Sequence, residues 1–475
     1  MRDLLLLSIF SPLTLLSLVH PWAGLLTFGW VAFLKPHSMI WSFAAQIPFN
    51  LVIAITTAIG WAVSKEKKTF RLDLTAALLI ALTLVAALST VFSLAPEISK
   101  VEFNKYMKTM AFLLLLRVML TSRVRLHGYI WLMAFAIGFF GLNGGTLFIV
   151  TAGAHHLAGP LQSEITDRNH LALALLVGIP LMNYLRLQSR HRWMQLGLIG
   201  AMVMTVMAVL ATYSRGGFIG LIAMGAFLWW RSRSRVLALV TLLVVAFGLH
   251  SVAPDSWKQR MGTIETAKTG DDSFKLRLLS WQTYASAAFD RPLTGAGMYA
   301  LQTGSIFFRY APDPATFGVV NRKPRAAHSI YLQVLGDLGL AGFALYIALL
   351  ATGFWNARWL ARATEGQPEL EWMADLGRMI QVSMVAFCVS GAALSMAFYD
   401  YFLSLLVVVA AVREMAEAKL GQRTSRRKAR SRQDEPLVET TAIAGIWQKA
   451  ADKKMTRLRG RAPGRGLASQ EGVAK

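Results

Sequence analysis

One histidine stands where a basic loop turns into a long apolar segment. His328 follows Arg325, and the apolar residues after it include Gly339 and Gly342. In a helix at ~100° per residue, Gly339 lies within about 20° of the face of His328, and Gly342 within about 40°. Glycines let a neighbouring membrane helix approach closely, so this face is expected to point into the protein. There the imidazole is either a general base in a cleft or only a cap at the mouth of the helix.

A second pattern is suited to binding phosphate. The run Ser214-Arg215-Gly216-Gly217 separates two apolar segments. Arginine is always charged and carries a planar fork of donors, and the N-terminus of a helix favours an anion. The pattern therefore predicts an anion site at Arg215. The alternative is an arginine that only extends from the apolar region to the water interface.

Further cations precede the histidine. Arg322, Lys323 and Arg325 stand just before His328. Crowded cations should lower the pKa of the imidazole and so favour the neutral form that a base needs. They should also attract a diphosphate.

Three carboxylates complete the set of charged residues. The run Asp167-Arg168-Asn169-His170 opens an apolar segment, where an aspartate is expected as the N-cap and Arg168 is an alternative substrate contact. Asp337 lies on the face opposite His328 and below the surface, where we expect it to pair with a polar or basic group of another helix; direct catalysis is the alternative. Asp400, between two tyrosines, is a further acid–base candidate.

The composition places these residues in a membrane. Of the 475 residues, 55% are hydrophobic and only 16% charged, more apolar surface than a soluble fold of this length buries. The single cysteine, Cys388, excludes a disulfide framework. No Walker loop is present, and the histidines at 155, 156 and 170 lack partners with zinc-ligand spacing, so neither ATP hydrolysis nor a metal site is expected.

The charge pattern predicts the topology. The net charge of +23 divides between basic clusters that alternate with apolar spans and a basic C-terminal tail, which favours positive-inside sorting over nucleic-acid binding. We expect an all-α, multi-pass protein of about 12 transmembrane helices with a cytoplasmic N-terminus and one N-terminal piece that does not fully cross. The expected spans lie near 4–19, 23–34, 49–63, 73–93, 105–121, 127–151, 169–187, 193–212, 216–230, 235–252, 328–355, 375–396 and 400–413.

Four regions follow from these spans. N-terminal membrane helices occupy 1–252, a large extracytoplasmic loop 253–327, C-terminal membrane helices 328–413, and a basic, disordered cytoplasmic tail 414–475. The loop contains an amphipathic stretch at 273–289 that is expected to form a surface helix. The tail either binds anionic lipid heads or is simply solvated.

The spacing His328-Ser329-x9-Gly339-x-x-Gly342 resembles the O-antigen ligase and polymerase superfamily. Ser214 to Gly217, Asn169, and the order Arg277, Trp281, Pro292 to Gly297 also match elements of that family, and the likeness runs from about Leu74 to Val412. The Met-Arg-Asp start and the Lys-Pro-His and Ile-Pro-Phe elements look like the O-glycosylation ligases that accompany exosortase A systems.

The resemblance implies a GT-C-like glycosyltransferase of the bacterial inner membrane. It would pass a glycan from undecaprenyl diphosphate to a hydroxyl of a protein, lipid or glycan at the periplasmic face, with inversion and without cofactor or metal. His328 would be the base, and Arg215, Arg277, Arg325, Arg322 and Arg168 would bind the diphosphate. Asn169, Asp337, Asp400, Ser329, Gly339 and Gly342 would support them. A polymerase, a polysaccharide or lipid transporter, and a non-catalytic scaffold are the alternatives.

Overall fold

The chain is described from a computed structural model. It covers residues 2–39, 44, 47–66, 68, 71–160, 163–232, 234–236, 272–320, 323–433 and 438–459. Two compact units divide the chain, Met1–Ala416 and Glu417–Lys475. The predicted span at 235–252 and Arg322 lie outside the described residues, apart from the first two positions of that span.

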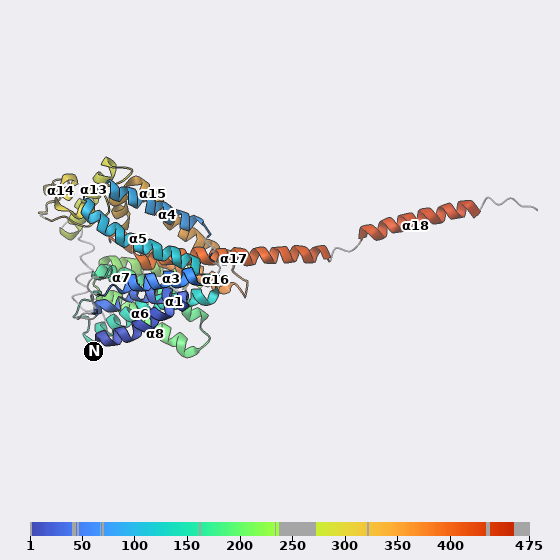
Figure 1. The fold of residues 1–475 in the computed structure, drawn as a ribbon, viewed down its shortest axis with the longest axis horizontal. Helices are drawn as coiled ribbons and strands as arrows, with labels where there is room; N and C mark the ends of the chain where they lie inside the picture. The colour runs from blue at the N-terminus through green and yellow to red at the C-terminus, as the bar shows by residue number, and fades with distance from the viewer. Residues whose placement is uncertain are drawn as a thin grey trace, which may run out of the picture. The chain divides into compact units, whose positions relative to one another are not determined.

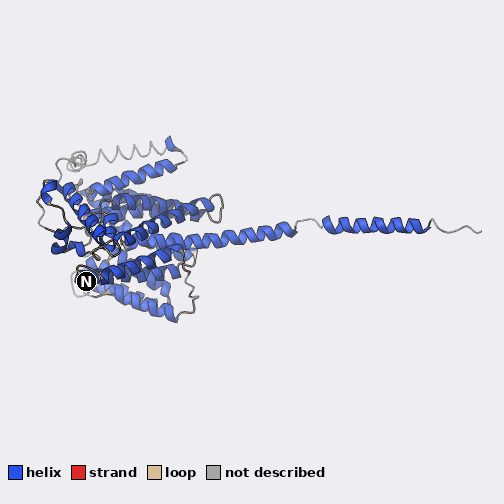
Figure 2. Cartoon of the chain, turned by 90° about the horizontal axis from the view of Figure 1, so that it is seen from above, coloured by secondary structure: helices blue, strands red, loops and turns tan. Residues whose placement is uncertain are grey.

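The described residues form helices and no strands (Figures 1 and 2). The helices are α1 (Arg2–Val19), α2 (Pro21–Leu34), α3 (Phe49–Val63), α4 (Leu74–Val91), α5 (Pro96–Met119), α6 (Arg123–Val150), α7 (Arg168–Gln188), α8 (Arg192–Ala211), α9 (Arg215–Arg231), α13 (Asp272–Asp290), α14 (Gly304–Tyr310), α15 (Ile330–Ala363), α16 (Glu371–Gly391), α17 (Asp400–Gln433) and α18 (Val438–Arg459). Short 3₁₀ turns lie at Pro36–Met39, Ala300–Gln302 and Pro314–Phe317.

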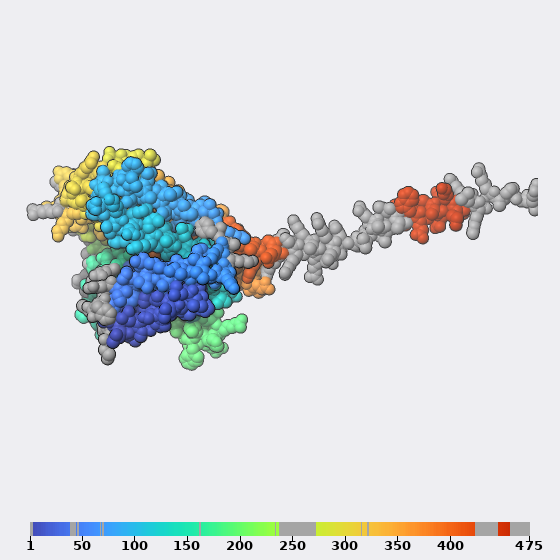
Figure 3. Space-filling model, in the orientation of Figure 1, coloured from blue at the N-terminus to red at the C-terminus, as the bar shows by residue number. Residues whose placement is uncertain are grey.

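Six described helices are long and apolar enough to cross a membrane: α4, α6, α7, α8, α15 and α16. The all-α class is confirmed, and the chain is a multi-pass membrane protein; the count of about twelve spans stays a prediction. Helices α1, α3 and α4 leave large apolar side chains such as Leu15, Ile59 and Leu84 exposed. These blue segments form much of the face seen in Figure 3, as expected of a surface in contact with lipid.

Arginines pair with carboxylates at the end of the bundle where α15 finishes, which we call the basic end. Arg117 contacts Asp73 at 2.6 Å and Glu414 at 2.5 Å through its Nη2. Arg378 reaches Asp375 at 2.9 Å. Arg117 belongs to one of the basic clusters from which we predicted the cytoplasmic side. We call the other end, where α15 begins, the site end.

The N-terminal helices differ from the prediction. Phe10 of α1 packs on Phe49 at the start of α3, with ring centroids 4.5 Å apart, and Ser17 Oγ donates to Thr56 Oγ1 at 2.7 Å. Helix α1 therefore runs parallel to α3, and the N-terminus lies at the site end (Figure 1). The sequence analysis predicted a cytoplasmic N-terminus, which corresponds to the basic end. The charge pattern gave no guidance there, because Arg2 next to Asp3 leaves almost no net charge to sort by.

The described part of the large loop is folded. Helix α13 confirms the helix expected at 273–289, and it begins one residue earlier and ends one later. Its buried face joins α14 and the neighbouring turns in an apolar cluster of Leu279, Tyr284, Ala287, Ala296, Ala300, Leu301, Ile306, Phe307, Val319 and Ala327. This cluster gives the region a core of its own and so holds Arg277, which lies on the same helix, in a fixed place.

Helix α15 is bent at Gly339, where φ is 71° and ψ is −172°. The amide of Leu340 donates to the carbonyl oxygen of Pro292 at 2.7 Å, and a Cβ on Gly339 would lie 2.5 Å from that oxygen. The neighbour that approaches Gly339 is therefore the 292–297 turn and not a helix. Because the bend interrupts the helical rotation, the common face calculated for His328 and Gly339 is wrong. A Cβ on Gly342 would meet Leu338 of its own helix.

The described part of the second unit is helical, whereas a disordered tail was expected. Helix α17 continues to Gln433, and α18 spans Val438–Arg459. Alanine, lysine, arginine and glutamate have high helix propensity, which accounts for helices in a segment too polar to build a core.

Candidate functional site

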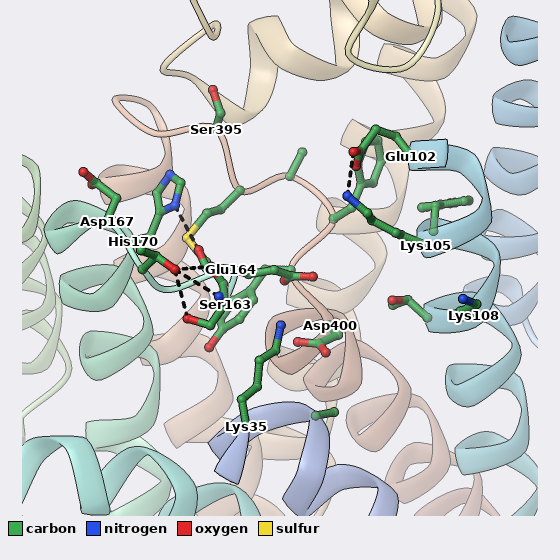
Figure 4. Close-up of a pocket in the computed structure, with 18 of the residues that line it drawn as sticks. Lys35, Glu102, Lys105, Lys108, Ser163, Glu164, Asp167, His170, Ser395 and Asp400 are labelled. Atoms are coloured by element: carbon green, nitrogen blue, oxygen red, sulfur yellow. Dashed lines mark hydrogen bonds and ion pairs between the residues drawn. The ribbon is translucent and has the colours of Figure 1, made fainter. Parts of the chain in front are cut away.

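A cavity of about 1060 Å³ opens at the site end. Its walls come from α2, α5, the segment before α7, the turn at 298–299, the first turn of α15 and the 395–400 segment between α16 and α17. Figure 4 shows charged side chains from several of these elements directed into it. Pockets that take drug-sized ligands have volumes of roughly 300–1,000 Å³, so this cavity is large enough for a ligand of that size.

The cavity brings together charges that are far apart in the sequence. Its cationic residues are Lys35, Lys105, Lys108 and Arg168, and its carboxylates are Glu102, Glu164, Asp167 and Asp400. Lys105 Nζ donates to Glu102 Oε1 at 2.7 Å. In Figure 4, Lys35 extends toward Asp400 and Glu164. The formal charges of these eight residues cancel.

Helix starts and ends position several of these groups. Lys35 ends α2 in the left-handed conformation, with φ 48°, and this turns its side chain away from the helix. The Asp167 carboxylate accepts from the Asn169 amide at 2.7 Å and from Asn169 Nδ2 at 2.8 Å. The predicted N-cap is thus confirmed, and Arg168 stands beside it on the cavity wall.

Glu164 has the most perturbed carboxyl group outside the membrane helices. Its pKa is raised to about 8, first by burial and then by the negative charge of Asp400, while Lys35 and Lys105 oppose the shift. The exposed surface of the side chain faces the cavity, which it lines. Its backbone carbonyl is 3.0 Å from His170 Nδ1. Glu164 therefore keeps its proton to a higher pH than an ordinary glutamate does, and in that form it can donate a hydrogen bond.

His328 lies next to the cavity. Its amide donates to Ser395 Oγ at 2.8 Å, and Ser395 lines the cavity. The pKa of the imidazole is lowered to about 4, first by burial and then by the charges of Arg277, His170 and Arg325. The neutral imidazole expected from the sequence agrees with this direction, although burial is the larger cause. Ser329 caps α15 by accepting from the Leu332 amide at 3.5 Å.

The predicted arginines occupy different places. Arg277 and Arg325 are close enough to His328 to lower its pKa, but neither is among the described residues that line the cavity. Arg215 begins α9, where Ser214 Oγ accepts from the Gly217 amide at 3.0 Å. Gly216 and Gly220 face the end of α16 near Ser390, and Gly217 faces Ala172 of α7.

Asp337 lies away from the cavity. It is 1% exposed, and its carbonyl oxygen accepts from Ser89 Oγ at 2.7 Å and from the Gly297 amide at 3.2 Å. Among the described residues its Oδ1 has no hydrogen-bond partner, so the structure does not supply the side-chain partner expected for that atom. Asp337 therefore joins α4, α15 and the 292–297 turn through its backbone.

The sequence analysis missed several cavity residues, among them Lys35, Glu102, Lys105, Glu164 and Ser395. One signal was available for Glu102 and Lys105. Helix α5 begins at Pro96, but the span was predicted from residue 105, so a charged helical turn was counted as loop. Glu164 and Lys35 offered no comparable signal, because the fold brings them together from separate segments.

Two family models match the chain. Residues 200–347 match a family described as O-antigen ligase. Residues 1–191 match a family of unknown function. No curated protein matched the chain. The first match contains Arg215, Arg277 and His328; it supports the O-antigen ligase superfamily and, with the six apolar helices, a multi-pass membrane enzyme that transfers glycans.

Proposed function

We propose that the protein is a glycosyltransferase that moves a glycan from undecaprenyl diphosphate to an acceptor hydroxyl at the periplasmic face of the inner membrane. The observation that carries the proposal is His328, a histidine of low pKa beside a large cavity, within the segment that matches O-antigen ligases. A neutral histidine at neutral pH is suited to act as a base.

The proposed reaction is a direct displacement. His328 takes the proton of the acceptor hydroxyl while its oxygen forms a bond to the anomeric carbon of the donor sugar. The bond from that carbon to the diphosphate oxygen breaks, and undecaprenyl diphosphate leaves with the electron pair. Attack opposite the leaving group inverts the carbon. This scheme needs no metal, since arginines can stabilise the charge that develops on the diphosphate.

The arginines around His328 are the proposed diphosphate site. Arg277 and Arg325 act on His328 electrostatically, and Arg215 is the third contact. Arg322, known from the sequence alone, is a fourth. Arg168 stands on the cavity wall and is the least direct of the five.

The acceptor defines the subtype. We favour a ligase that attaches glycan to protein or to surface polysaccharide, of the kind found with exosortase systems, and keep a polymerase of the same superfamily as the second candidate. A transporter is less favoured because the described charged side chains concentrate at the two ends of the bundle.

The test is the substitution His328→Ala, with transfer of glycan from extracted lipid-linked donor measured in membranes. A base contributes roughly 10² to 10⁴-fold, so transfer should fall by that range while the protein still inserts. His191→Ala, at an exposed histidine at the start of α8 on the basic end, is the matched control. Near-normal transfer by His328→Ala would leave the histidine as a helix cap and make Asp400 the next candidate.

Comparison of cells with and without the gene would define the subtype. Loss of glycan from surface proteins or polysaccharide, with lipid-linked glycan accumulating at full length, indicates a ligase. Accumulation of short lipid-linked repeats indicates a polymerase.

A further inference from the structure

The cavity and the arginines near His328 have different electrostatic character. The charged residues of the cavity walls are four cations and four carboxylates. Among the charges that lower the pKa of His328, Arg277 comes first, ahead of His170 and Arg325, and neither arginine is among the described residues that line the cavity. A diphosphate dianion is attracted to guanidinium groups and repelled by carboxylates, so Arg277 and Arg325 suit it better than a cavity whose walls carry as many carboxylates as cations.

The cavity offers what a neutral, hydroxyl-rich ligand needs. Ionised carboxylates accept hydrogen bonds from hydroxyl groups, and lysine and a protonated carboxyl group donate them. Glu102, Glu164 and Lys35 supply these functions from three different elements. Each group keeps polar surface toward the cavity, so a bound hydroxyl would replace water.

Aromatic side chains share the cavity wall with these polar groups. Tyr106 and Phe398 line the cavity as an edge-to-face pair with centroids 5.1 Å apart, and Phe28 stacks on Phe112 at 4.5 Å. A sugar ring has apolar C–H faces and a polar rim, so it matches a wall that carries both aromatic rings and hydrogen-bonding groups. A lipid tail offers no hydrogen bonds to the polar groups of this wall, so it matches the cavity less well.

The two matched segments of the chain divide the site. Lys35, Glu102 and Glu164 belong to residues 1–191, the segment that matches a family of unknown function. His328 and Arg277 belong to residues 200–347, the segment that matches O-antigen ligases. The link between the two sides passes through Ser395, which lines the cavity and accepts from the His328 amide at 2.8 Å.

We propose that the cavity is a sugar-binding subsite in which residues 1–191 recognise the hydroxyl groups of the transferred or receiving glycan, while the diphosphate binds at Arg277 and Arg325, outside it. Arg168, which lines the cavity, then contacts the sugar and not the diphosphate. This inference rests on the proposed function, because it assigns the cavity to one part of the same reaction. It gives a role to the segment of unknown function, and it names Glu102 and Glu164 as specificity residues.

The first experiment measures binding and does not depend on transfer. The full-length protein in nanodiscs is titrated with three probes: extracted lipid-linked glycan, the same glycan released from its diphosphate, and undecaprenyl diphosphate without sugar. Glu102→Gln and Glu164→Gln keep side-chain shape but remove the charged or proton-donating carboxyl. A hydrogen bond to a charged group corresponds to roughly 10- to 100-fold in affinity, so Glu102→Gln should weaken the binding of both glycan probes by that much. Glu164→Gln exchanges a neutral hydroxyl donor for an amide, so it should weaken their binding by less, roughly 2- to 10-fold.

Glu97→Gln is the matched control. Glu97 lies on α5 like Glu102, and each is paired with the lysine three positions later, but Glu97 is exposed outside the cavity. This control should bind all three probes as the wild type does. Undecaprenyl diphosphate should bind equally to all four proteins. Weakened binding of the bare diphosphate to the cavity variants, or unchanged binding of the released glycan, would overturn the proposal.

The second experiment separates donor sugar from acceptor sugar. If Glu102→Gln and Glu164→Gln raise the KM for the lipid-linked donor alone, the cavity binds the transferred sugar. If they raise only the KM for the acceptor, it binds the receiving glycan; both results support a sugar subsite. Unchanged KM values for both substrates, with transfer still abolished in His328→Ala, would contradict the subsite and leave the proposed function intact. Normal transfer in His328→Ala, with glycan binding weakened in the carboxylate variants, would contradict the proposed function and leave the sugar subsite intact.

Discussion

The amide of Leu340 donates a hydrogen bond to the carbonyl oxygen of Pro292 at 2.7 Å, across the bend of α15. A helix normally satisfies that amide within itself, so the bond replaces one that the bend removes. The 292–297 turn also donates to the carbonyl groups of Gly336 and Asp337. The folded loop is thereby attached to the helix that begins just after His328, and Arg277 is held relative to the imidazole.

Substitution of Gly339 tests this attachment. Gly339→Ala requires a side chain at φ 71°, and its Cβ would lie 2.5 Å from the Pro292 oxygen. Gly366→Ala is the control, because Gly366 also has φ 71° but no described atom within 4 Å of its Cβ position. We expect Gly366→Ala to cost about 1–3 kcal/mol and Gly339→Ala to cost more. Thermal unfolding in detergent measures the loss of stability in each variant. Equal losses would mean that the close contact of Gly339 with the 292–297 turn does not contribute to stability.

The pKa of His328 predicts the acid limit of activity. The neutral imidazole is lost as the pH falls through its pKa, so kcat/KM should decline near pH 4. Arg277 lowers that pKa, so Arg277→Gln should raise it and move the decline to higher pH. Arg309→Gln, at an exposed arginine on α14, should leave the profile unshifted. A profile in Arg277→Gln that keeps the wild-type limit would show that the limit belongs to another group.

Arg215 is expected to bind the donor through its fork of donors. Arg215→Lys keeps the charge but loses the planar pair of hydrogen bonds, so kcat/KM for the lipid-linked donor should fall roughly 10- to 100-fold. The protein should still insert, as membrane abundance would report. Full activity in Arg215→Lys would make the residue a simple point charge, and full activity in Arg215→Ala would remove it from the site.

The topology predicts opposite accessibility for the two ends of α15. In a Cys388→Ser background, Thr316→Cys lies in the folded loop and Glu369→Cys in the exposed turn after α15. An impermeant thiol reagent added to intact cells should label position 316 and not position 369. The reverse pattern would place the cavity on the cytoplasmic side and contradict the proposed donor.

The sequence was sufficient for features that depend on local pattern. The helix at 273–289 and the N-cap at Asp167 follow from amphipathic spacing and from cap chemistry, and both are present. The bend at Gly339 was not predicted, because a continuous helix was assumed; the freedom of glycine at positive φ was the available signal.

Features that depend on tertiary packing lay beyond a single sequence. The contact of His328 with Ser395 joins positions 67 residues apart, and neither residue type specifies the other. The raised pKa of Glu164 depends on Asp400 and on burial from several segments. A glutamate in a short loop is common and carries no signal of a site in the sequence. Glu164 belongs to the site only because the fold places it there.

The division of the site between two stretches of chain has an evolutionary consequence. A change at Glu102 or Glu164 would alter what the cavity accepts without touching His328 or Arg277, which stand on a separate stretch of the chain. Selection could therefore diversify the sugar preference of such proteins while the proton-transfer apparatus is inherited unchanged. If residues 1–191 are exchanged between relatives that use different glycans, the sugar preference should be transferred with that segment.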